Sequence, residues 1–308
     1  MKALCQTLAC LLIPLLAYPQ SAPDINFITT DVESFWRHFD EFKKDTTRNP
    51  FTLYLNEGTA ALKDFIPYRI VSDTALKKRI RQELPYYEAV RPAIFNYDTL
   101  KGRVRRYASA LKSIYPATTV PDIHFVVGRI TAGGTTTDDA IMIGAEMYAD
   151  TITTTSYGFT AMHVNQIPEV ILHCIIYYNQ KPAPVGYHIL RQSIVEGAAQ
   201  FIATLVSEKE RNGIWQKENF KYGEANEELL VREFQMRKYD SDFDGWLYHG
   251  PTEDGRPANV GTWLGYKITA AYYQNAADKQ KAVAEILLLN DFERFILLSG
   301  YLNQFQDN

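Results

Sequence analysis

The chain has 308 residues, of which 46% are hydrophobic and 22% are charged, an ordinary composition for a globular protein. This composition excludes disorder, collagen and coiled coil as the main architecture. Lys and Arg number 32 against 36 Asp and Glu, so the net charge is −4. Because no basic excess exists to neutralise phosphates, we expect no nucleic-acid partner.

The first 22 residues have the pattern of a secretory signal peptide. Lys2 supplies one positive charge, an apolar run follows from Ala3 to Ala17, and Ser21 and Ala22 are small residues suited to cleavage. The run is shorter than the ~20 residues that span a bilayer. No later segment is long and apolar enough to be a membrane anchor, so we expect an exported protein with no integral membrane segment. Lipidation at Cys10 is the alternative, although apolar residues continue after this cysteine.

The predicted cleavage leaves one cysteine in the mature chain. Cys5 and Cys10 lie in the signal segment, and Cys174 is the third cysteine of the sequence. An exported chain with a single cysteine forms no internal disulfide. We therefore expect packing alone to stabilise the fold.

The first third of the mature chain is predicted to be helical. Thr30–Glu33 has the signature of a capping box, and apolar residues follow at helical spacing. A second helix is expected from about Thr52 to Asp64. Ser72 is expected to cap a third helix, and Asp98 a fourth that ends at about Ile114. The apolar stripes of these helices are typical of a plain core.

The pattern then changes to one typical of strands. Ile123–Val127 is rich in β-formers, and Ala140–Gly144 is a second such run. Gly133 and Gly134, with a cluster of Thr and Asp, form a turn signal between them. We predict that the two runs pair as a β-hairpin.

The rest of the chain is again predicted to be helical. The expected helices are Ile167–Asn179, ended by Pro182 and Pro184, then Ile189–Glu208, Glu224–Arg237, Trp263–Tyr273, Gln280–Leu289 and one capped by Asp291 and stopped by Gly300. Helix dominates and the sheet is small, which indicates an α+β fold. We expect one domain, 23–308, made of an N-terminal helical part (23–120), the hairpin and site helices (121–208) and a C-terminal helical part (209–308).

Two of these helices carry the residues of chemical interest. A helical zinc hydrolase needs two ligands four residues apart, a Glu directly after the first ligand as general base, and a third ligand from a neighbouring helix. His173 occupies the first ligand position and Tyr177 the second. Cys174 occupies the base position, and Glu196 is placed to be the third ligand on the following helix.

The segment resembles the gluzincin class of zinc peptidases, with an H-E-x-x-H helix followed by a Glu ligand. It is most similar to secreted bacterial predicted zinc-dependent proteases, which are related in pattern to gliding-motility-type lipoproteins. Those chains read H-E-x-x-H-x-x-Q and then E-G-A-A-D-F-I. The resemblance spans about residues 30–300 and extends to these segments: Gly128–Ile130, Gly133–Thr136, Gly144–Met147, Arg256–Gly261 and Trp263–Tyr266. It implies a zincin-like fold, with the small sheet or hairpin beside the site helix, in a secreted, periplasmic or cell-envelope protein of bacteria.

The sequence departs from the family pattern at three positions of the site. Cys174 replaces the general base, Tyr177 replaces the second His ligand, and Gln200 replaces an Asp that resembles an outer partner of a ligand. A general base contributes roughly 10²–10⁴ in rate, and a phenol with a pKa of about 10 is a weaker zinc ligand than imidazole. The departures predict a pseudopeptidase in which zinc is doubtful.

His173 and Glu196 each allow a plainer interpretation. His173 lies among apolar residues and is either a hydrogen-bonded core histidine or a residual metal ligand. Glu196 lies on a helix that is apolar nearly all round, and Glu is almost never buried unless it is paired. We therefore predict that Glu196 pairs with His173 or with the hydroxyl of Tyr177.

Cys174 is either a small buried hydrophobe or a nucleophile beside His173, although adjacent helical residues diverge by about 100°. Other residues are weaker candidates for the site. His163, His188 and His249 are either additional ligands or surface and loop residues. Arg256 and Tyr266 lie in a stretch that resembles a cleft wall, where such residues stabilise an oxyanion, or they pack at the start of a helix.

Three functions remain open. The first is a pseudopeptidase that binds a peptide or protein partner, for example by adding a strand to the exposed edge of the hairpin. The second is an active zinc peptidase with an atypical site of His173, Glu196 and Tyr177 or a nearby His. The third is a structural component of the cell envelope.

Overall fold

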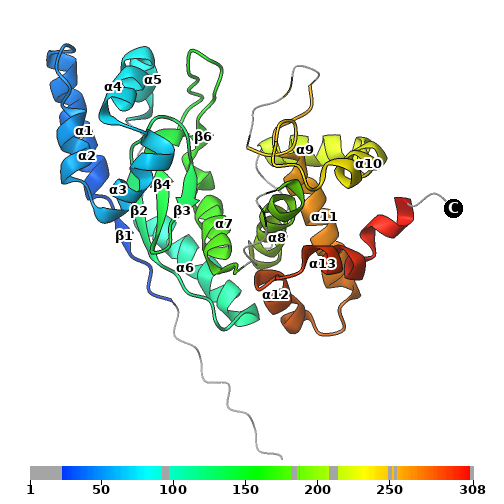
Figure 1. Ribbon diagram of the computed structural model, residues 1–308. Helices are drawn as coiled ribbons and strands as arrows, with labels where there is room; N and C mark the ends of the chain where they lie inside the picture. The colour runs from blue at the N-terminus through cyan, green and yellow to red at the C-terminus, as the bar shows by residue number, and fades with distance from the viewer. Residues whose placement is uncertain are drawn as a thin grey trace, which may run out of the picture.

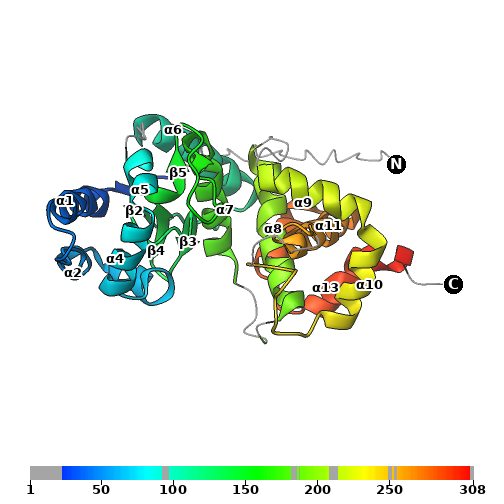
Figure 2. The same cartoon turned by 90° about the horizontal axis from the view of Figure 1, so that it is seen from above.

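The structure is a computed structural model that describes residues 23–91, 97–181, 186, 188–207, 214–248, 252 and 255–305. It is an α+β protein that is mostly helical, as predicted. Figure 1 shows a half that contains the sheet and a half that contains helices alone. Seen from above, α7 lies at the border of the first half and α8 at the border of the second (Figure 2). None of the described helices has the length and apolar character needed to cross a membrane.

The helices before the sheet differ from the prediction at several points. They are α1 (Thr30–Lys44), α2 (Phe51–Glu57), α3 (Ala60–Phe65), a π-helical turn (Ile66–Ile70), α4 (Asp73–Gln82), α5 (Leu84–Val90) and α6 (Tyr97–Ile114). The capping box at Thr30 is wrong, because the helix is capped by Thr29 without a side-chain hydrogen bond. The predicted second helix breaks at Gly58, and Thr59 caps α3 by accepting from the backbone N–H of Leu62. Ser72 caps α4 as predicted. Asp98 does not cap the fourth predicted helix, because α6 already begins at Tyr97, and α5 was not predicted.

The four-stranded sheet corrects the predicted hairpin. Its strands are β1 (Phe27–Ile28), β2 (Asp122–Val126), β3 (Gly134–Thr136) and β4 (Ala140–Gly144), in the order β1-β2-β4-β3. β2 and β4, the two predicted runs, pair in parallel, and β3 forms the antiparallel hairpin with β4. The physical reason is burial: every residue of β4 is buried, which favours a central strand with a neighbour on each side. A second, two-stranded sheet joins β5 (Tyr148–Ala149) to β6 (Met162–His163).

The remaining helices largely follow the prediction. They are α7 (Ile167–Asn179), α8 (Ile189–Ser207), α9 (Ile214–Ala225), α10 (Glu227–Arg237), α11 (Val260–Asn275), α12 (Lys279–Leu287) and α13 (Phe292–Ser299). Asp291 caps α13 and Gly300 ends it with a φ of 64°, as predicted. The predicted helix from Glu224 is wrong at its start, because α9 ends at Ala225 and α10 begins at Glu227. Pro182, Pro184 and the end of the predicted helix at Glu208 lie outside the described residues.

Helices α8 and α11 cross with their backbones in contact. A Cβ atom on Gly265 would lie 1.8 Å from the carbonyl oxygen of Ser193, and one on Gly197 would lie 2.2 Å from the carbonyl carbon of Gly265. The small residues are spaced four apart on both helices, Ser193 and Gly197 against Gly261 and Gly265, so they line one face of each. This crossing fixes α8, and therefore the residue next to Gly197, which is Glu196.

Candidate functional site

Glu196 is the centre of a small polar network between three parts of the chain. Its Oε2 lies 3.3 Å from Nε2 of His173 on α7. Its Oε1 accepts a hydrogen bond of 2.9 Å from the hydroxyl of Tyr248, which precedes α11. The predicted pairing of Glu196 with His173 is therefore confirmed, and both oxygens of the carboxylate have partners.

No motif in the sequence marks Tyr248, the third member of this network. Its φ of 66° places it in the left-handed region, where an aromatic residue is rare. The side-chain oxygen of Asn259 accepts from the backbone N–H of Tyr248 at 2.8 Å, and the ring lies edge-on to Phe243. Strained backbone often accompanies a functional or positioning role, but only the structure reveals it.

Cys174 lies on α7 next to His173 but belongs to the packing of the sheet. It is buried, and a Cβ atom on Gly134 of β3 would lie 2.9 Å from its Sγ. Burial, and then the charge of Glu196, raise the pKa of the Cys174 thiol to about 12. The thiolate that nucleophilic chemistry needs is therefore scarce at neutral pH, and Cys174 is a small buried hydrophobe.

The other two positions of the degenerate motif are also in the core. Tyr177 is partly buried and packs against the hydrophobic core one turn after His173. Gln200 is buried on α8 one turn after Glu196. Between the two helices, Gln180 donates from Nε2 to the carbonyl oxygen of Val195 at 2.9 Å, which holds the end of α7 against α8.

The additional histidines have local structural roles. His163 is exposed, and its Nδ1 accepts from the backbone N–H of Asn165 at the start of a 3₁₀ turn. His188 accepts from the backbone N–H of Arg191 at the start of α8 and lies edge-on to Tyr239. These contacts agree with the interpretation as surface and loop residues. His249 lies outside the described residues.

Arg256 takes part in an ion pair with α10. Its guanidinium donates to both carboxylate oxygens of Glu233 at 3.0 and 2.5 Å, and the indole N–H of Trp246 donates to the same carboxylate at 2.8 Å. Tyr266 packs its ring edge-on to Phe201 and Phe220. Arg256 is held by an ion pair and Tyr266 by aromatic packing. The cleft role of both residues stays a prediction.

Among the described residues, the His, Cys, Asp and Glu side chains do not gather into a group suited to zinc. Zinc in proteins takes at least three protein ligands. In the part of the chain that the structure describes, no group of three or more His, Cys, Asp or Glu could hold a metal ion. His173 and Glu196 supply two donor side chains, Oε1 of Glu196 accepts from Tyr248 while Oε2 faces His173, and Cys174 is a buried neutral thiol.

Comparison with known families identifies the chain's relatives. A family model described as gliding motility protein GldB matches residues 19–302. The chain belongs to the GldB family. This GldB-family protein is a component of the bacterial cell envelope, as the expected localisation stated. No curated protein and no solved structure matches the chain significantly.

The family match corrects the assignment to gluzincins and to secreted zinc-dependent proteases. His173-Cys174-x-x-Tyr177 keeps one of the three residues that define H-E-x-x-H, so the motif carried little information about chemistry. Glu196-Gly197 has a structural explanation, since Glu196 pairs with His173 and Tyr248 while Gly197 contacts the backbone of Gly265. Metallopeptidase and pseudopeptidase are therefore the wrong classes. The zincin-like fold stays a prediction, because no solved structure matches.

Proposed function

We propose that this GldB-family protein is a non-catalytic component of the gliding machinery at the cell envelope and that it acts by binding a protein partner. The observation that carries the proposal is that both oxygens of Glu196 face partners within the protein. A carboxylate has about four acceptor sites, and a general base or a metal ligand directs at least one of them at a substrate or an ion. Here Oε2 faces His173 and Oε1 accepts from Tyr248.

The network has a structural role that follows from the elements it joins. His173 lies on α7, Glu196 on α8, and Tyr248 in the segment between α10 and α11. α7 belongs to the half with the sheet, while α8 and α11 belong to the helical half (Figure 1). Hydrogen bonds to a charged group contribute about 1.5–3 kcal/mol each to stability. We infer that Glu196 holds the two halves in a fixed relation.

The edge of the sheet is the surface that we propose for the partner. β3 pairs with β4 on one side, and none of the described strands pairs with its other side. The backbone N–H of Gly144 donates to the carbonyl of Gly133, and that of Thr137 to the carbonyl of Ala140. Because antiparallel pairing alternates along a strand, the backbone groups of Thr136 point to the open edge. An extended segment of a partner can add there as a fifth strand.

Complementation of gliding tests the non-catalytic role. In the source bacterium with its own gene deleted, Glu196→Gln should restore gliding, because the amide keeps the shape and accepts from Tyr248. Glu196→Ala should lower protein stability by about 1–3 kcal/mol, since it leaves His173 and Tyr248 without their partner. Loss of gliding in Glu196→Gln at normal abundance and unchanged melting temperature would overturn the proposal, since a catalytic carboxylate is lost in this variant.

A second pair of variants tests the proposed edge. Thr136→Pro removes the N–H that points outward, a change tolerated at an edge strand. Thr136→Val is the matched control, because it changes the side chain and keeps the N–H. We expect the Pro variant to fold and to glide poorly while the Val variant glides normally. Normal gliding of a stable Thr136→Pro protein would show that no partner strand pairs there.

A further inference from the structure

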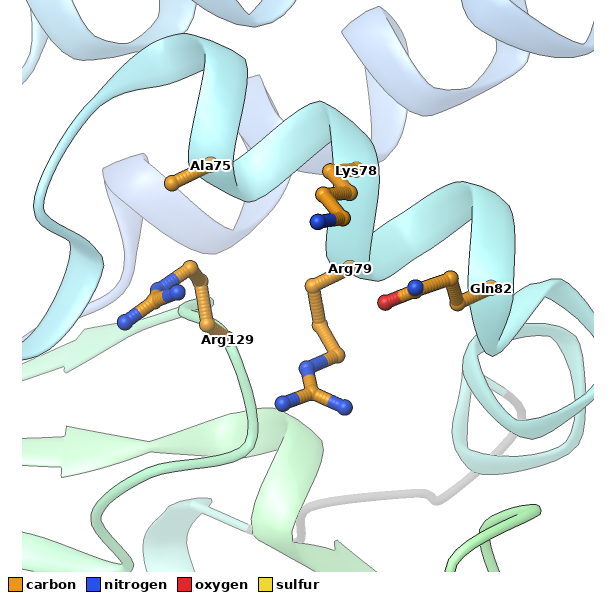
Figure 3. Close-up of a pocket in the computed structure, with 5 residues that line it drawn as sticks. All are labelled: Ala75, Lys78, Arg79, Gln82 and Arg129. Carbon is orange, nitrogen blue, oxygen red and sulfur yellow. The ribbon is translucent and has the colours of Figure 1, made fainter.

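A cationic pocket lies between α4 and the loop that follows β2. It has a volume of about 310 Å³ and is lined by Ala75, Lys78, Arg79, Gln82 and Arg129. Figure 3 shows Arg79 extending from α4 and Arg129 from the loop below it, with their guanidinium groups pointing in different directions. Three of the five lining side chains carry a positive charge, and none carries a negative one. None of the residues that line the pocket belongs to β3 or to the Glu196 network, so the proposal does not rest on the proposed function.

The cations of the pocket are not neutralised by acids. Among the described residues, Lys78, Arg79 and Arg129 form no ion pair. Arg129 donates from Nε to the carbonyl oxygen of Arg69 at 3.4 Å, and the guanidinium of Arg79 lies 4.8 Å from the ring centre of Tyr157. Both contacts leave further guanidinium N–H groups for a ligand, because each Arg has five.

The acids nearest in sequence to Lys78 and Arg79 have other partners. Asp73, at the start of α4, accepts from the hydroxyl of Thr52 and from the backbone N–H of Thr74. Glu83, directly after α4, is buried and accepts from the backbone N–H and the hydroxyl of Ser156. These two acids are engaged elsewhere, and an anion that enters the pocket gains charge-assisted hydrogen bonds.

Large apolar side chains are exposed on the two segments that flank the pocket. Tyr157, which lies against Arg79, is 50% exposed, and Ile152 of the same loop is 92% exposed. Tyr68 is 83% exposed and Val71 57%, on either side of Arg69, whose carbonyl oxygen accepts from Arg129. Exposed apolar groups beside cations are typical of surfaces that contact a membrane interface.

We propose that this pocket binds a phosphate group carried by an anionic lipid at a membrane surface. Arginine presents planar, paired donors that match phosphate oxygens, and Lys78 adds a point charge. Two guanidinium groups and an ammonium suit the multiple charge of a phosphate monoester better than the single charge of a carboxylate. The exposed tyrosines and aliphatic side chains then contact the lipid interface around the headgroup.

Vesicle binding by the mature protein tests the proposal. The probes are phosphatidylcholine vesicles with and without phosphatidic acid, and inorganic phosphate alone. The double variant Lys78→Gln/Arg129→Gln removes two charges from the pocket. The control variant Lys77→Gln/Arg81→Gln removes two charges from residues of α4 that do not line the pocket. We expect the pocket variant to bind phosphatidic acid vesicles about tenfold or more weakly and the control variant to change far less.

The remaining arms separate the sources of the phosphate. Tyr68→Ser should weaken binding to vesicles and leave binding of inorganic phosphate unchanged, because it removes only apolar contact. If inorganic phosphate binds in the pocket but vesicles do not bind, the ligand is the free phosphate ion and the lipid proposal is wrong. Equal losses in the two double variants would show that diffuse surface charge binds the vesicles, and absence of binding to both probes would overturn the pocket altogether.

Discussion

Glu146 is a buried carboxyl group whose two oxygens differ in their surroundings. Oε1 accepts from the backbone N–H of Ile130 at 3.1 Å, while Oε2 is buried and has no hydrogen-bond partner among the described residues. Burial raises the pKa of Glu146 to about 7, which hydrogen bonds from the backbone only partly oppose. The side chain of Glu146 holds the loop after β2, so the protonation of Glu146 affects the stability of the fold.

The raised pKa predicts a dependence of stability on pH. The folded state keeps the proton of Glu146 up to about pH 7, whereas the unfolded chain loses it near 4.5. Its contribution to stability is therefore full below about pH 4.5, falls as the pH rises to about 7, and is then constant. We expect the free energy of unfolding to fall by about 3 kcal/mol over this range relative to Glu146→Gln. The measurement is urea unfolding of both proteins at several pH values. If their free energies of unfolding change with pH in the same way, the prediction is wrong.

The buried thiol of Cys174 should resist modification. With its pKa raised to about 12 by burial, the native protein contains almost no thiolate at neutral pH. We expect a disulfide reagent to label the mature protein slowly when folded and rapidly in denaturant, where the thiol regains an ordinary pKa. Because Cys5 and Cys10 lie in the predicted signal segment, the labelling reports on Cys174 alone. Fast labelling of the folded protein would show that the thiol is accessible.

At the scale of elements, the crossing of α8 and α11 should tolerate no added atom. Gly265→Ala places a Cβ atom 1.8 Å from the carbonyl oxygen of Ser193, so the helices must separate. We expect a loss of about 3 kcal/mol or more in the free energy of unfolding. Gly102→Ala on α6 is the matched control, because its Cβ atom meets nothing within 4 Å. It should stabilise the protein by about 0.5–1 kcal/mol, and similar melting temperatures for the two variants would contradict the crossing.

The helices were predictable wherever an apolar stripe and a cap coincide. α4 begins after Ser72 and α13 lies between Asp291 and Gly300, as local chemistry requires. Strand pairing was not predictable, because Ile123–Val127 and Ala140–Gly144 have the same composition whether they are parallel or antiparallel. The short strand Gly134–Thr136 carries no apolar run, so the sequence showed a turn where the structure has the edge of the sheet.

Half of the site was predictable for a similar reason. A carboxylate on an apolar helix requires a partner, which pointed to Glu196 and to His173 on the preceding helix. Tyr248 lies 52 residues from Glu196 and in no helix, so no spacing rule connects them. The cationic pocket was missed because Arg129 and α4 become neighbours only through the fold.

At the scale of the whole molecule, the protein should fold without a metal. The described His, Cys, Asp and Glu residues form no set of three around one point, and Glu196 has protein partners. We expect mature protein purified without chelators to contain far less than one zinc per chain. A chelator should leave its melting temperature unchanged, because no metal is released from the folded state. One zinc per chain, with a lower melting temperature after its removal, would contradict this.

The contact between α8 and α11 also has a consequence for export. The two helices are separated by more than fifty residues, and α8 is buried along most of its length, largely against α11. During translocation α8 therefore emerges before α11. Until α11 follows, the apolar surface of α8 is exposed to water and to other chains. Contacts so distant in sequence form late in folding. We expect a chaperone that binds newly exported chains to cover α8 until α11 has emerged. Export without such a chaperone favours aggregation.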